Sequence, residues 1–460
     1  MPPNWLWGYG IPIGLLLLTW GGLPPHKARR ITPLVALAVA LAVIGYWAVG
    51  FAFHLGGAHA LYPEEAALRG LNRLLAPSGP GWGLVGLAGF FLAGELVTPD
   101  VLALFLAYLP VVTSAVLLVI LALADARRWV MVTAGALTGT VVFPIAACWV
   151  WGSGWLARLG QTLELPPGFV DFGGSALMLW LPATMAMGVL LWLPRRAEEE
   201  VGTPPPAYFP LLANVGVLVM GVAWMGWALS GPFHVAGATW DWNRAAVSAL
   251  LGMAGSVLTS QLYAWLTTGE PGALLAARGI AAGWAAVLAG APFLPPWAAL
   301  VVGMLAGLVS PLLLYVLDAR ARLADAAGTL ALGLSGGMWG IISVALFADG
   351  RGGQGWNDSA GGVTGLIFGG GVTPLLAQVF GLVALGLWGL FWGSLLGVLA
   401  RPWRRVGVVD TASYTDEAIP AEPAPESEPE PESEPEPEPE SVPAPVDVDT
   451  PVPGLAEEGA

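Results

Sequence analysis

The sequence is poor in charge. Only 11% of its 460 residues are Asp, Glu, Lys or Arg, whereas 56% are hydrophobic. Soluble domains contain about 25% charged residues. A soluble fold could not bury so many apolar side chains, so the composition excludes the soluble classes of protein. It predicts an all-α polytopic membrane protein, in which lipid covers the apolar surface.

The chain also lacks the residue patterns that most enzymes use. It has one cysteine, Cys148, so no disulfide can form within the chain. It has no phosphate-binding loop, no metal-ligand spacing and no Ser/His/Asp set. Its glycine-rich runs lie inside apolar stretches, where they suit close packing of helices. We therefore predict no enzymatic activity, no cofactor, no metal and no nucleic-acid partner.

Positive charge is absent from the end of the chain. After Arg405 there is no Lys or Arg, and the residues from Asp410 onward hold 16 of the 32 acidic side chains. This segment is rich in Pro and Glu, so it cannot bury apolar area and its like charges repel. We predict a disordered cytoplasmic tail over 408–460 that follows a transmembrane domain over 1–407.

Long apolar runs are the main feature of that transmembrane domain. Eleven runs are long enough to cross a membrane, at 5–22, 31–54, 99–123, 130–149, 173–194, 208–230, 244–266, 276–293, 296–317, 327–348 and 373–400. If the N-terminus is outside, most of the basic residues fall on the inner side of the membrane. They are Lys27, Arg29, Arg30, Arg127, Arg128, Arg195, Arg196, Arg320, Arg322, Arg401, Arg404 and Arg405. This bias predicts an N-out/C-in, multi-pass protein of the cell membrane, with eleven transmembrane helices.

Short motifs recur at fixed places along these runs. Trp151-Gly-Ser-Gly154 follows the fourth run, and Asp171-Phe-Gly-Gly-Ser175 overlaps the start of the fifth. Ala223-Trp-Met-Gly-Trp227 lies in the sixth, and Asp325-Ala-Ala-Gly328 precedes Gly337-Met-Trp-Gly340 in the tenth. In order and spacing these motifs resemble those of the ammonium transporter, methylammonium permease and Rh family. The resemblance covers about residues 5–407.

The resemblance implies a trimer in which each protomer has its own narrow pore. Each protomer would consist of two five-helix inverted repeats plus one extra helix. Trp151 would form one wall of an outer cation site, and Trp227 would replace a gating Phe. Ser230, or Gly231 with a register shift of one residue, would take the place of a Ser that accepts from ammonium. Asp171 would cap the fifth helix, either for stability alone or also to raise cation affinity at the outer mouth.

Two positions depart from the family. Its paired pore histidines, each eight residues after an Asp, are Leu179 and Gly333 here. The four histidines of the chain lie elsewhere, and His234, just outside the sixth run, is a candidate vestibule ligand. Charge does not cross a dry apolar tube cheaply, and no other ionisable residue is predicted in the middle of either half.

Three functions are therefore open. The first is an ammonium/ammonia transmembrane channel, which recruits ammonium at the outer aromatic site and passes ammonia through an apolar pore. The second is a degenerate member, either a channel for another small neutral solute or an ammonium sensor without transport. The third is a structural subunit of another transporter. A PII-type signal protein binds the inner face of many family members. Here the usual C-terminal regulatory segment is only faintly present, near Arg405-Val-Gly-Val-Val-Asp410.

Overall fold

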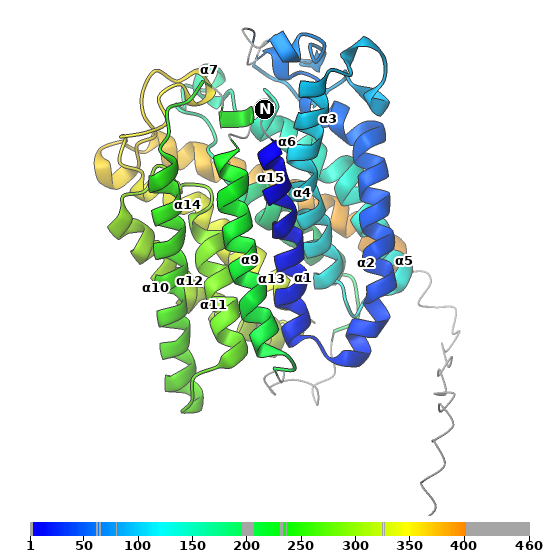
Figure 1. Cartoon of the computed structure of the whole chain (residues 1–460), viewed down its shortest axis with the longest axis vertical. Coiled ribbons are helices and arrows are strands. Elements are labelled where there is room, and N and C mark those ends of the chain that lie inside the picture. The colour runs from blue at the N-terminus through cyan, green and yellow to red at the C-terminus, as the bar shows by residue number, and fades with distance from the viewer. Residues whose placement is uncertain are drawn as a thin grey trace, which may run out of the picture. The chain divides into compact units, whose positions relative to one another are not determined.

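Long apolar helices run side by side in the computed structural model (Figure 1). The structure describes residues 3–401 except 61–62, 64–65, 80, 196–206, 231–232, 236, 324 and 326. Within these residues, eight helices are long and apolar enough to cross a membrane. In an apolar solvent the backbone N–H and C=O groups must bond to each other, and a helix satisfies them within one segment. The predicted class, an all-α polytopic membrane protein, is confirmed.

The elements follow one another in simple order. The helices are α1 (Gly10–Gly22), α2 (Pro25–Gly45), α3 (Phe51–Leu55), α4 (Pro99–Ala122), α5 (Arg128–Leu137), α6 (Phe143–Trp151), α7 (Leu159–Thr162), α8 (Leu181–Leu190), α9 (Pro210–Leu229), α10 (Trp242–Thr268), α11 (Ala273–Val287), α12 (Pro296–Tyr315), α13 (Thr329–Leu332), α14 (Met338–Phe347) and α15 (Thr373–Ala400). Two short strands, β1 (Leu74–Leu75) and β2 (Val85–Gly86), pair antiparallel, with Leu74 opposite Gly86.

Turns of π-helix join several of these helices into continuous rods. They are η2 (Tyr46–Gly50) between α2 and α3, η7 (Thr138–Val142) between α5 and α6, η8 (Ser175–Trp180) before α8, η11 (Val316–Arg320) after α12 and η12 (Gly333–Gly337) between α13 and α14. Single π turns in α-helices are frequent at functional sites. Two of the five, η8 and η12, contain the positions of the missing pore histidines.

Each of the eleven predicted runs contains a helix. Three of these helices, α1, η8–α8 and α11, are shorter than the eight apolar spans, so the number of membrane crossings remains a prediction, as does the orientation. The predicted start of the second helix was wrong. It begins at Pro25 rather than at residue 31, because Pro at the first position has a backbone angle suited to a helix and needs no N–H partner there. The predicted tail, 408–460, lies outside the described residues.

The long connections gather at one end of the helices, which we call the loop-rich end (Figure 1, top). They are the segments between α3 and α4, between α6 and η8, and between α14 and α15. The opposite end has short connections such as those from α1 to α2 and from α4 to α5. The loop-rich end is the one that the charge bias predicts to be outside.

The rods η8–α8 and α13–η12–α14, which correspond to the fifth and tenth predicted runs, begin with matching caps. The carboxylate of Asp171 accepts hydrogen bonds from the backbone N–H groups five and six residues later, at 3.0 and 3.1 Å. The carboxylate of Asp325 accepts from the groups at the same two offsets, at 3.1 and 2.8 Å. A glycine with positive φ, Gly174 or Gly328, follows three residues after each Asp. The first rod starts at the loop-rich end and the second ends there, as two inverted repeats require.

Candidate functional site

Trp151 is the last residue of α6 and lies at the loop-rich end. Its side chain is 1% exposed, and its indole Nε1–H donates to the backbone carbonyl of Asp171 at 2.8 Å. The Asp171 side chain caps the next rod, so one residue holds both the indole and the helix start. Burial raises the pKa of the Asp171 carboxyl to about 6, against the opposing effect of the backbone N–H groups that donate to it. Two predicted site residues thus lie together.

Trp227, in the last turns of α9, joins them. Its indole N–H donates to the carbonyl of Ala107 at 2.8 Å, and its ring centroid lies 6.4 Å from that of Trp151. The hydroxyl of Ser230 donates back to the carbonyl of Trp227, which leaves the oxygen lone pairs of Ser230 to accept from a ligand. Gly231, the alternative to Ser230, lies outside the described residues.

His234 lies against the face of Trp151. The two rings stack at a centroid distance of 4.3 Å and an interplanar angle of 13°. The ring Nε2 is 2.8 Å from the carbonyl oxygen of Phe172, and Nδ1 is 2.9 Å from the hydroxyl of Tyr108. A carbonyl can only accept, so we assign the proton to Nε2, and Tyr108 donates to Nδ1. Burial lowers the pKa of His234 to about 3, so the ring is neutral at pH 7.

A second imidazole lies behind Tyr108. His54, in α3, has its Nδ1 at 3.0 Å from the hydroxyl of Tyr46, and its ring centroid is 4.9 Å from that of Tyr108. Its Nε2 is buried and has no hydrogen-bond partner among the described residues. We call Tyr46, His54, Tyr108, Trp151, Trp227 and His234 the mouth cluster. All six side chains are at most 5% exposed.

Sequence reasoning missed the two tyrosines of the mouth cluster and did not single out His54. A signal was present, because a tyrosine inside an apolar run needs a partner for its hydroxyl once it is buried. The partner could not be read from spacing, because Tyr108 and His234 are 126 residues apart.

Leu179 and Gly333, the positions of the missing histidines, meet deeper in the protein. Both are buried. A Cβ atom added at Gly333 would lie 2.6 Å from the carbonyl oxygen of Leu179 and would also contact the Cβ of Ala183. The two rods therefore cross with their backbones in contact. The space that a histidine side chain would need at position 333 is filled by the neighbouring helix.

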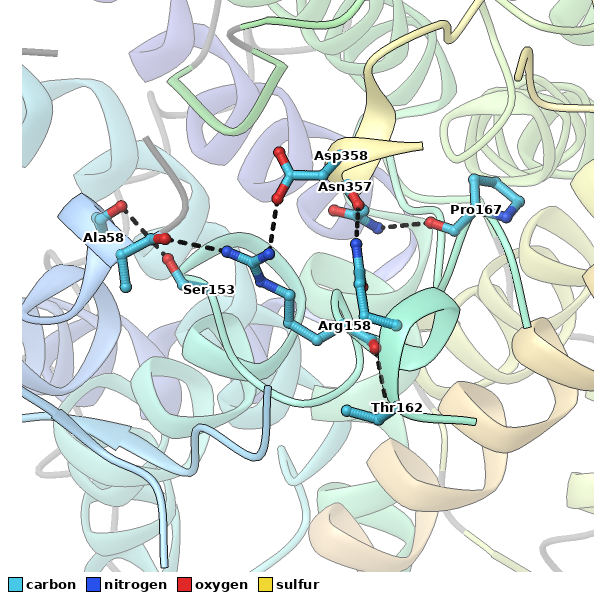
Figure 2. Close-up of polar contacts among 9 residues, drawn as sticks. Ala58, Ser153, Arg158, Thr162, Pro167, Asn357 and Asp358 are labelled. Atoms are coloured by element: carbon cyan, nitrogen blue, oxygen red, sulfur yellow. Dashed lines mark hydrogen bonds and ion pairs between the residues drawn. The ribbon is translucent and has the colours of Figure 1, made fainter. Parts of the chain in front are cut away.

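The connections above the mouth cluster are joined by polar contacts (Figure 2). The guanidinium of Arg158 pairs with Asp358 at 2.6 Å and donates to the carbonyl of Ala60 at 3.0 Å. The amide of Asn357 donates to the carbonyls of Pro167 and Phe169, both at 3.1 Å. We call these side chains, Arg158, Asn357 and Asp358, the loop clamp. They join all three long connections.

The loop clamp is continuous with the mouth cluster. Trp356 precedes Asn357, is 3% exposed, and packs edge-on against His234 at a centroid distance of 6.3 Å. The backbone N–H of Thr239 donates to the carbonyl of Gln354 at 2.8 Å. The segment that carries His234 is thus attached to the connection between α14 and α15.

Known sequences match most of the chain. A family model described as Ammonium Transporter Family matches residues 12–408. The ammonium transporter Amt2 of Archaeoglobus fulgidus is 27% identical over 362 residues, which cover 74% of this chain and 75% of that protein. Ammonium transporter 3 of Dictyostelium discoideum is 28% identical over 258 residues, covering 55% of this chain and 58% of the relative.

Solved structures share the fold. The structure of Candida albicans Mep2 aligns with a TM-score of 0.69 at 19% identity, covering 88% of this chain and 86% of that chain. A structure called Sensor Amt Protein also aligns with a TM-score of 0.69, at 18% identity, over 87% of this chain and 94% of the other. At such identities the likeness concerns the arrangement of the helices alone.

Proposed function

The chain belongs to the ammonium transporter family, and we propose that it carries ammonium or ammonia across the cell membrane. A multi-pass membrane protein whose described residues include eight apolar spans is suited to that task. The observation that carries the proposal is the position of Trp151. Its indole is fixed by the carbonyl of Asp171 at the loop-rich end, where a buried ring can attract a cation that has left water.

Capture of ammonium at the loop-rich end is the first step. The face of an indole attracts a small cation electrostatically, and the attraction grows as water is removed. The oxygens of Tyr108 and of the Phe172 backbone, which both bond to His234, can accept from the N–H groups of ammonium, and so can the hydroxyl oxygen of Ser230 beside Trp227. The Asp171 carboxylate adds negative charge near the mouth while it caps the fifth rod.

Passage is the second step, and it favours the neutral form. Where the rods cross at Leu179 and Gly333, the surroundings are backbone and aliphatic side chains. A charge there would lose its hydration without gaining a charged or strongly polar partner. Ammonium gives up a proton, which returns to the water on the side of capture, and ammonia crosses the apolar region. The family and the mouth geometry support this route. The family also supports a homotrimer as the assembly. We do not include a PII-type partner, because the C-terminal segment that it would need is only faintly present.

Uptake of labelled methylammonium by cells expressing the chain tests the proposal. Trp151→Ala should raise the half-saturating concentration about 2- to 30-fold, the equivalent of about 0.5–2 kcal/mol for a cation–π contact. Trp265→Ala is the matched control, because that side chain is 64% exposed on α10. Binding of methylammonium to purified protein without any uptake would overturn transport and favour the sensor.

A further inference from the structure

One face of the Trp151 indole is already covered in this structure. His234 lies parallel to the indole at 4.3 Å, which is van der Waals contact between two aromatic rings. Trp227 lies on another side of the same imidazole, with a centroid distance of 6.0 Å. A cation cannot reach that face of Trp151 while His234 remains there.

The groups around His234 suit a small cation with several N–H donors. His234 supplies two N–H groups to this site. Its Nε2–H donates to the carbonyl of Phe172 at 2.8 Å, and its backbone N–H donates to the hydroxyl oxygen of Tyr108 at 3.0 Å. If His234 moved away, an aromatic face and two oxygen acceptors would remain. Ammonium and methylammonium can satisfy both acceptors and stack on the ring at once.

His234 lies in the connection between α9 and α10. The residue lies in a short 3-10 turn, Phe233–Val235, and not in one of the membrane helices. Gly237 has a φ of 79°, and the backbone N–H of Thr239 bonds to the carbonyl of Gln354. Rotation of the His234 side chain about its own bonds would uncover Trp151 while α9 and α10 stay in place.

We propose that His234 is an internal occupant of a cation subsite formed by Trp151, Tyr108 and the Phe172 carbonyl, and that ammonium or methylammonium must displace it. His234 thereby lowers the affinity of the mouth for these cations. This inference rests on the proposed function for the identity of the cation. It goes beyond that function by assigning control of the mouth to a residue outside the positions of the pore histidines.

Nuclear magnetic resonance on the full chain in lipid nanodiscs tests displacement directly. The chain has four histidines, so 13C,15N-histidine labelling gives few signals, and the His234 signal is identified by its loss in His234→Gln. Without ligand it should show the neutral tautomer protonated at Nε2. Saturating methylammonium chloride, compared with sodium chloride at the same concentration, should change the chemical shifts of the His234 ring. They should take the averaged values of an exposed ring that exchanges between its two neutral tautomers. An unchanged His234 signal, while calorimetry shows methylammonium bound, would overturn the inference.

The variant His234→Ala supplies a second, independent measurement. Removal of the occupant should lower the dissociation constant for methylammonium at least threefold, since a ligand that must displace a group binds more weakly than one that meets a free site. His59→Ala, at the same end of the protein, is the matched control. Weaker or equal binding in His234→Ala, in a variant with normal circular dichroism, would contradict the proposal. Displacement of His234 and tighter binding in the variant, without any uptake by cells, would support the role of His234 and would reject only the proposed transport.

Discussion

Burial keeps the imidazole of His234 neutral, so displacement of this ring should depend on pH. The pKa of His234 is about 3 in the observed position and about 6.5 for a ring in water. The displaced state therefore binds a proton more readily, and lowering the pH favours displacement. Between pH 7 and pH 5 the equilibrium should move toward displacement roughly 25-fold.

Initial rates of methylammonium uptake at pH 7 and pH 5 measure this effect, since methylammonium is charged at both. Other titratable groups face the same region, namely Tyr108 on α4, His54 on α3 and the Asp171 carboxyl, whose pKa of about 6 falls inside the tested range. The variant His234→Ala separates them. It should lose most of the acid stimulation, and an unaltered pH profile would assign the effect to another group.

Gly333 should tolerate no side chain. An added methyl group would meet the carbonyl of Leu179 at 2.6 Å, and overpacking of this kind costs about 1–3 kcal/mol. We expect Gly333→Ala to lower the melting temperature of the purified protein by several degrees. Gly361→Ala is the control, because an added Cβ has no neighbour within 4 Å there. Equal melting temperatures would show that the rods can separate at this crossing.

At the scale of residues, the sequence predicted part of the site. Trp151, Asp171 and Trp227 lie in short local motifs, so their positions at the mouth could be anticipated, although their roles in binding stay predictions. His234 was only one candidate among several. Its contacts with Trp151 and Tyr108 depend on the packing of helices far apart in the chain, and local spacing carries no information about that packing.

At the scale of elements, both caps should stabilise the start of a rod. Each Asp satisfies buried backbone N–H groups at a rod start, and its removal leaves these donors without acceptors, at a cost of about 1–3 kcal/mol. Asp171→Ala and Asp325→Ala should therefore both destabilise the purified protein, and Asp325→Ala by more, because it also removes the negative charge that interacts with Arg278. Asp125→Ala should change stability little, because Asp125 forms a partly exposed ion pair with Lys27. A loss confined to one cap would contradict a stabilising role for the carboxylate in both halves.

The helices themselves were the most predictable elements, since a long apolar run without charge has few other ways to satisfy its backbone. The π turns were not predicted. They arise where one rod adjusts to its neighbours, as at η8 and η12, and no residue pattern marks them. The early start at Pro25 was missed because the first turns contain Lys27, Arg29 and Arg30, which break the apolar pattern but still allow a helix.

At the scale of the whole molecule, the loop clamp should control how firmly the mouth is covered. Arg158→Ala removes the ion pair with Asp358 and the bond to Ala60. Hydrogen exchange should then speed up in the connections on both sides of the clamp, around residues 152–170 and 349–364. Arg351→Ala is the control, since that side chain is 83% exposed. Exchange rates that match the unmodified protein would mean that apolar packing alone holds these connections.

The family and the fold could be predicted at this scale because the order of several weak motifs is more specific than any one of them. The number of crossings, the orientation and the trimer remain predictions. They depend on a membrane and on partner chains, and neither is a property of one protomer.

The contact between the two rods at Gly333 also limits what protein engineering can build into this chain. Histidine at position 333 would require the Leu179 backbone and Ala183 to move out of the way. Histidine at position 179 alone would bury an imidazole without the second imidazole to bond to. A design that introduces a histidine pair must therefore first separate the two rods.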